Sequence, residues 1–249
     1  MRPPSDALLP YQQPAFQNEA GELADYLVTL SVSQLQRHMS LSKAKAEQTK
    51  QLAEDWSDDK SRQRPAIDAF LGDIYSGLQV QSFTEDDRAY ANKHLLILSG
   101  LYGGLRALDS IHPYRLEMGY RLPDQKYSNL VKFWNSKIAE VIPSHDVVIN
   151  LSAVEYSKAV LPHITNKVIT PKFLTMSPKT AEPRFVTVHA KIARGAFAHW
   201  MIKHRIEEAK ELTAFTELGY TYDDSLSTPE EPVFVCSEFK GLGLSVRLT

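Results

Sequence analysis

One cysteine, Cys236, is all that the 249 residues contain. A single thiol excludes an intrachain disulfide and a cysteine-rich metal site. Its position after the apolar residues VFV predicts a buried structural thiol. No apolar run approaches the roughly 18 residues of a membrane span, and the start, MRPPSDALLP, lacks the basic-then-apolar pattern of a signal peptide. We therefore expect a cytoplasmic protein with no membrane partner.

The sequence patterns of several enzyme classes are missing as well. Neither the phosphate-binding pattern GxxxxGK[ST] nor the zinc-binding pattern HExxH occurs. His199 and His204 are five residues apart, whereas a spacing of four places two side chains on one helical face. Ser152 lacks the GxSxG context of a nucleophilic serine. The sequence therefore assigns no metal site, no cofactor and no catalytic residue.

Positive and negative charges are unevenly distributed, although the net charge of the chain is only −2. Residues 158–210 contain ten Lys and Arg against three Glu, a net charge of +7. Residues 211–232 contain six acidic residues and no basic one, a net charge of −6. Such asymmetry gives one face of a protein a field that attracts anions, unless the fold mixes the two segments into a neutral surface. The sequence leaves both outcomes open.

Length and hydrophobic periodicity predict a single α/β domain over residues 1–249, in which most helices precede most strands. Residues 1–18 contain four prolines and are expected to be irregular. Apolar residues at helical spacing dominate the first half, and short runs rich in Val, Ile, Phe and Thr dominate much of the second. The predicted helices occupy 19–56 (with caps at Ser31 and Ser33), 63–78, 82–100 (capped by Thr84) and 191–212. The predicted strands occupy 146–152, 166–174 and 183–190, followed by a closing pair at 219–224 and 231–239.

The stretch SGLYGGLRALDSIHPYRLEMG, residues 99–119, is too polar for a core segment and too aromatic for a linker. Gly100 and Gly103 allow a sharp turn or a close approach of the backbone to a ligand. Arg106 follows the turn, where it can supply charge for a phosphate, and Arg115 follows further along. The alternatives are a plain tight turn, and an internal ion pair of Arg115 with Glu117.

Two further stretches place polar groups near predicted strand ends and helix starts. In VVINLSAVEYSKAV, residues 147–160, Asn150 and Ser152 follow an apolar strand, and Tyr156 and Lys158 follow them. Ser152 is interpreted either as a plain helix cap or as part of an anion site.

The third stretch, HAKIARGAF, places Lys191 and Arg194 three residues apart, after His189. The two cations are therefore neighbours on one helical face. They lie near the N-terminus of the predicted helix, where positive charge opposes the helix dipole. Local stability does not explain them, whereas an anionic partner, or a nearby carboxylate such as Glu155, does.

Five blocks of the sequence together resemble one known family. They are FLGDIYSGL, LSGLYGGLRALDSIHPYRLEMG, VVINLSAVEYSKAV, AKIARGAFAHWMI and FTELGYTYDD. In order and spacing they are similar to the YaaA family of peroxide-stress proteins. The resemblance implies a bacterial cytoplasmic protein that helps cells to survive hydrogen peroxide and to limit free iron and oxidative DNA damage. It also implies a single α/β domain with a mixed sheet flanked by helices, and a basic cleft.

Members of that family are reported to bind DNA through an element like a helix-hairpin-helix. The matching residues are Leu98 to Leu105, with Gly100 and Gly103 at the turn. The resemblance implies largely sequence-independent DNA binding, with a basic cleft built from Arg106, Arg115, Lys158, Lys191 and Arg194.

The start of the chain departs from the family pattern. Members begin with an apolar strand followed by SPAKT, whereas this chain begins MRPPSDALLPY. We expect either a truncated gene model or a branch that has lost this motif.

Two function classes remain at this point. The first is a stress-linked DNA-binding protein without enzymatic activity. The second is an enzyme acting on a small anionic or nucleobase-like substrate in the same cleft, because polar groups that converge on one pocket are typical of a small-molecule site. Direct iron binding is less favoured, since the usual His and carboxylate spacing is missing. The groups that the enzyme would use are Asn150, Ser152, Tyr156, His189, Lys191 and Arg194.

Overall fold

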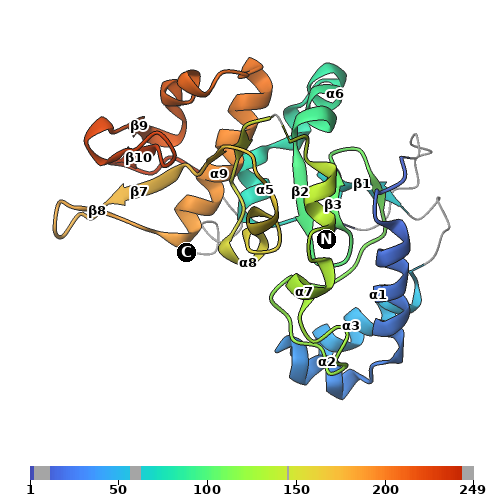
Figure 1. Cartoon of the computed structure of the whole chain (residues 1–249). Helices are drawn as coiled ribbons and strands as arrows, with labels where there is room; N and C mark the ends of the chain where they lie inside the picture. The colour runs from blue at the N-terminus through green and yellow to red at the C-terminus, as the bar shows by residue number, and fades with distance from the viewer. Residues whose placement is uncertain (3–11, 57–62, 145, 243–249) are drawn as a thin grey trace. The chain divides into compact units, whose positions relative to one another are not determined.

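A computed structural model describes residues 1–2, 12–56, 63–144 and 146–242 (Figure 1). The chain has the expected α/β fold, with many helices and a mixed sheet. The described residues group into two compact units, and each is described here by itself. Unit 1 comprises residues 1–70, 92–143 and 153–164, and unit 2 comprises 71–91, 144–152 and 165–249. The single domain over residues 1–249 stays a prediction. No helix in the described ranges combines the length and the apolar character that crossing a membrane requires.

Unit 1 begins with the three helices α1 (Gln17–Thr29), α2 (Val32–Met39) and α3 (Lys43–Glu54). The predicted cap at Ser31 is confirmed, because its hydroxyl accepts the backbone N–H of Gln34 while the Gln34 side chain accepts the N–H of Ser31. This reciprocal pair satisfies backbone donors that the first helical turn leaves open. The helices bury Ala20, Leu23, Leu27, Leu35 and Met39.

The rest of unit 1 consists of short elements, and its Trp134 side chain is fully buried. The Trp134 indole N–H donates to the carbonyl of Gly100 at 3.0 Å. Strands β1 and β4 pair antiparallel, and so do β2 and β3. The elements are β1 (Arg64–Pro65), α4 (Ala66–Ala69), β2 (Leu96–Ser99), β3 (Gly103–Arg106), β4 (Ser110–Ile111), α7 (Leu130–Trp134), η3 (Lys137–Val141), α8 (Val154–Ser157) and η4 (Leu161–His163).

The helix predicted over 82–100 is only partly correct. Thr84 does cap a helix, since its hydroxyl accepts the N–H of Asp87 at 3.2 Å, but α6 (Glu85–His94) ends six residues early. Leu96–Ser99 then forms β2, because Gly103 adopts a φ of +67° and turns the chain back so that β3 can pair with it. The helix-hairpin-helix expected over Leu98–Leu105 is therefore wrong: this segment is a β-hairpin.

Unit 2 contains a four-stranded mixed sheet in the order β8-β7-β10-β9. Strand β10 pairs parallel with β7 and antiparallel with β9, and β7 pairs antiparallel with β8. Strands β5 and β6 pair parallel as a separate two-stranded sheet. The closing pair of strands is thereby confirmed. The strands are β5 (Val148–Ile149), β6 (Val168–Ile169), β7 (Lys172–Met176), β8 (Pro183–Arg184), β9 (Tyr220–Tyr222) and β10 (Val233–Cys236).

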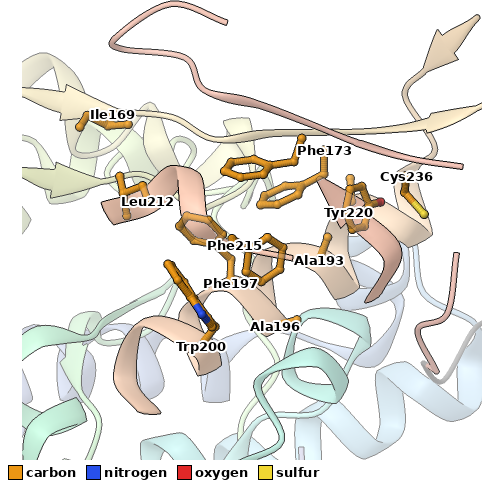
Figure 2. Packing of buried hydrophobic residues seen from close by; sticks show 12 residues of the cluster. Ile169, Phe173, Ala193, Ala196, Phe197, Trp200, Leu212, Phe215, Tyr220 and Cys236 are labelled. Atoms are coloured by element: carbon orange, nitrogen blue, oxygen red, sulfur yellow. The ribbon is translucent and has the colours of Figure 1, made fainter. Parts of the chain in front are cut away.

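The core of unit 2 is aromatic (Figure 2). The Phe173 ring lies among Phe197, Phe215, Tyr220 and Phe234, with ring centroids 5.4–6.0 Å apart. Such ring pairs add stabilisation beyond the apolar area that they bury. The remaining helical segments of this unit are α5 (Asp73–Leu78), η2 (Val80–Ser82), α9 (Thr187–His204), η5 (Ala209–Ala214), η6 (Glu217–Gly219) and η7 (Asp224–Leu226).

Two glycines bring α5 and α9 into backbone contact. A Cβ on Gly77 would lie 2.0 Å from the carbonyl oxygen of Ile192, and one on Gly195 would lie 1.8 Å from that of Ile74. The strand predicted over 183–190 is wrong in its second half, where α9 begins at Thr187. The helix predicted over 63–78 is broken before α5, where Gly72 has a φ of +141°.

Candidate functional site

The glycines of the β2–β3 hairpin are packing positions. A Cβ on Gly100 would lie 2.3 Å from the carbonyl oxygen of Leu116, and one on Gly103 would lie 2.8 Å from the Trp134 ring. Both glycines are buried. They let the hairpin close on its neighbours in unit 1, which is the tight-turn alternative left open by the sequence.

Arg106 ends β3 with an exposed side chain, and its backbone is held by a buried acid. The N–H of Arg106 donates to Oδ2 of Asp109 at 2.8 Å, and Gln12 Nε2 donates to Oδ1 at 2.9 Å. Asp109 is only 2% exposed. Burial raises the pKa of its carboxyl to about 6, against an ordinary 3.8. Sequence reasoning missed Asp109, which lies three residues after Arg106.

This buried carboxyl gives unit 1 a pH dependence that Asp109→Asn should remove. The folded protein keeps the proton up to about pH 6, whereas the unfolded chain releases it near 3.8. The Asp109 contribution to the free energy of unfolding therefore falls by about 2–3 kcal/mol as the pH rises through this window. In urea unfolding at a series of pH values, the stability of Asp109→Asn relative to wild type should rise over the same window. Parallel pH profiles for the two proteins would contradict this.

Arg115 lies half-buried in unit 1 and forms a polar cluster with two neighbours in the chain. Its guanidinium and the Glu117 carboxylate both act on the Tyr120 hydroxyl. Burial first, and the Glu117 carboxylate second, raise the pKa of Tyr120 and keep its phenol neutral. Arg115 and Glu117 are thus linked through Tyr120, a residue that sequence reasoning missed although it directly follows the PYRLEMG block.

Tyr156 lies in α8 of unit 1, where the backbone of Met118 acts on its hydroxyl. Burial, followed by the nearby carboxylates of Glu155 and Glu117, raises its pKa well above the ordinary 10. Lys158 follows at the end of α8 and is exposed.

Asn150 and Ser152 lie in unit 2, directly after β5, and bind each other. The Asn150 side-chain oxygen accepts the Ser152 hydroxyl at 2.8 Å and its N–H at 3.2 Å. Asn150 Nδ2 donates to Thr170 at 3.3 Å. The interpretation of Ser152 as a helix cap is wrong, because α8 begins after Ala153 and the Ser152 side chain is held by Asn150 instead.

His189 lies in the first turn of α9 and is held on two sides. Its Nδ1 lies 3.0 Å from the Thr175 hydroxyl, and its ring stacks on Phe239 with centroids 4.0 Å apart. Burial first, and the charge of Arg184 second, lower its pKa. The imidazole is therefore a neutral, packed group at neutral pH.

Lys191 and Arg194 lie on α9, as the sequence predicts. Lys191 is exposed and Arg194 is half-buried, and burial lowers the pKa of the Arg194 guanidinium. Within the part of the chain that the structure describes, neither side chain has an ion pair or a hydrogen-bond partner. Moving a guanidinium partly out of water without an acceptor costs free energy, which an anion at this position would return.

Three other cations of the +7 segment are paired with carboxylates, so the net charge of the segment overstates its field. Lys203 Nζ lies 2.7 Å and Arg205 Nη2 lies 3.0 Å from the buried Asp87 carboxylate. Lys172 Nζ lies 2.6 Å from Glu231, which belongs to the acidic segment. The fold thus mixes part of the two segments, and Lys191 and Arg194 are among the cations that these pairs do not include.

The candidate residues fall on both units. Gly100, Gly103, Arg106, Arg115, Tyr156 and Lys158 belong to unit 1, and Asn150, Ser152, His189, Lys191 and Arg194 belong to unit 2. A single basic cleft that joins them stays a prediction.

Cys236 is fully buried in β10, which confirms the structural thiol. Burial raises its pKa, so the reactive thiolate is disfavoured. Among the described residues, no group of three His, Cys, Asp or Glu side chains is arranged to hold a metal ion.

Comparison with known proteins identifies the family. A family model described as "Peroxide stress protein YaaA" matches residues 2–226. A UPF0246 protein of Salinispora tropica is 52% identical over 248 residues, which cover 99% of this chain and 94% of that protein. UPF0246 proteins of Roseobacter denitrificans and of Marinomonas sp. strain MWYL1 are 40% and 38% identical, and each alignment covers at least 90% of both chains. The family description supports a role in oxidative stress. The chain belongs to the YaaA family of peroxide stress proteins.

Proposed function

We propose that this protein binds DNA through the cations of α9, in the cytoplasm, and so helps to limit iron-driven oxidative damage during peroxide stress. The binding is largely independent of DNA sequence, because cations that contact phosphates carry no base information. Family membership supports the role in peroxide stress. The unpaired cations of α9 support contact with DNA phosphates.

The observation that carries this proposal is Arg194. It is a half-buried guanidinium with no partner in the described part of the chain, and Lys191 lies one helical turn before it. Phosphate oxygens are suited to a guanidinium, which can donate two parallel hydrogen bonds. Two cations one turn apart can engage neighbouring phosphates or one phosphate together.

The enzymatic alternative has less support. Asn150 and Ser152 satisfy each other, and Nδ1 of His189 faces Thr175. Three of the polar groups assigned to substrate binding are therefore engaged within unit 2 itself.

Binding of a labelled DNA duplex, measured by fluorescence anisotropy across a salt series, tests the proposal. We expect affinity to fall steeply with salt, since phosphate contacts release counterions. Lys191→Ala combined with Arg194→Ala should weaken binding about 10- to 100-fold at low salt and reduce the log–log salt slope by about 2.

Lys172→Ala is the matched control, because it removes a lysine that Glu231 already neutralises. This variant should bind within about twofold of wild type. Absence of binding at low salt would refute the proposal, and so would a double variant that binds like wild type.

A further inference from the structure

The exposed arm between β7 and α9 carries an aromatic side chain among cations. Every residue of the segment 178–185 is exposed, and the turn that joins β7 and β8 lies at the left edge of Figure 1. Phe185 is 58% exposed, and no other residue of this segment is a large exposed hydrophobic. A partner that covers the Phe185 ring would gain about 1.5–3 kcal/mol from its burial.

The arm has a defined backbone. Arg184 and Pro183 of β8 lie opposite Thr175 and Met176 of β7. The turn is closed by the N–H of Ser177, which donates to the carbonyl of Glu182 at 2.9 Å. Phe185 is therefore presented from a fixed strand end, two residues before α9 begins.

Another strand is a poor partner for this edge. Strand β8 is an outer strand of its sheet, and Pro183 lacks the N–H that a pairing strand would need. An apolar protein surface is also a poor partner, since it would meet a single exposed ring in a segment of net positive charge. Residues 178–194 contain Lys179, Arg184, Lys191 and Arg194 against Glu182, a net charge of +3.

We propose that Phe185 stacks on an unpaired base of single-stranded nucleic acid while the flanking cations hold its phosphates. This inference rests on the proposed function and names the form of nucleic acid. Stacking platforms beside basic residues suit single strands, because every base has a π-face and the bases of a duplex are already stacked. Arg184 precedes the ring in the chain and Lys191 follows it within six residues.

The test compares three labelled probes by anisotropy across a salt series that starts at low salt: an oligothymidine strand, a duplex of equal length, and a strand of equal length with abasic sites. Phe185→Ala should weaken oligothymidine binding by about 5- to 100-fold. It should leave the duplex, the abasic strand and the salt slope unchanged, because no charge is removed. Phe185→Trp should restore binding of oligothymidine.

Leu226→Ala is the matched control, since it removes a 47%-exposed hydrophobic from the acidic segment. This variant should bind all three probes with the affinity of wild type. Unchanged oligothymidine binding in Phe185→Ala, or an equal loss on all three probes, would overturn the inference. If Lys191→Ala with Arg194→Ala still weakens duplex binding in that case, the proposed function stands without it. If no probe binds to wild type, both proposals fall.

Discussion

Replacing Gly195 with alanine should cost unit 2 more than about 3 kcal/mol of unfolding free energy, or prevent its folding. The new methyl group would lie 1.8 Å from the carbonyl oxygen of Ile74 and 2.7 Å from the backbone nitrogen of Leu78. Both atoms belong to the backbone of α5, so no side-chain rotation relieves the overlap. Helix α9 would have to move away from α5, which would open a core of close-packed aromatic rings.

Gly21→Ala is the matched control for this prediction. Gly21 also lies inside a helix, α1, and the nearest atom to its new methyl would be a ring carbon of Trp56 at 3.5 Å, an ordinary contact. Alanine there should stabilise the protein by about 0.5–1 kcal/mol, because it favours the helix more than glycine does. Thermal and urea unfolding of both variants measure the difference. Equal stability changes in the two would show that α5 and α9 are not in backbone contact.

The second large effect is expected at Asp87, whose carboxylate is 5% exposed and faces two cations. Asp87→Asn should lower the free energy of unfolding by about 2–4 kcal/mol, since it leaves Lys203 and Arg205 without a counter-charge. The loss is smaller than for a fully buried pair because the two cations are 34% and 37% exposed. Asparagine still offers an oxygen to the N–H of Thr84, so the helix cap is retained.

The pH profile identifies this charge effect. Hydrogen bonds from Lys203 first, and from the Thr84 backbone second, hold the pKa of Asp87 far below its ordinary 3.8. The stabilisation is therefore fully present above about pH 4 and is lost as the pH falls toward the folded-state value. The gap between wild type and Asp87→Asn should close on acidification.

The Lys172–Glu231 pair is the control for Asp87, since both of its side chains are about half exposed. Glu231→Gln should change stability by less than about 1 kcal/mol. A gap between wild type and Asp87→Asn that does not depend on pH would mean that packing, and not charge, explains the effect of Asp87.

Local chemistry was sufficient for much of the secondary structure. Ser31 and Thr84 predict the starts of α2 and α6, because each hydroxyl accepts a backbone N–H three residues later. The short stretches GYTYDD and EPVFVCSEF predict the β9–β10 pair, and the apolar context of Cys236 predicts its burial. The family is also evident from the sequence, since its five blocks are contiguous stretches.

Tertiary structure decided the features that depend on partners distant in the chain. Residues Leu96–Ser99 continue the helical pattern of the preceding segment in the sequence. They form a strand because β3 pairs with them through antiparallel backbone hydrogen bonds. The glycines at 77 and 195 act through contacts between segments more than a hundred residues apart, which no local pattern encodes. Lys203 and Arg194 are both cations of α9, and the sequence does not distinguish their environments. In the fold, Lys203 pairs with the Asp87 carboxylate, whereas Arg194 has no acidic partner among the described residues. The sequence thus determines which residues favour helix, strand or turn, whereas pairing across long chain separations determines which charges remain available for an anion.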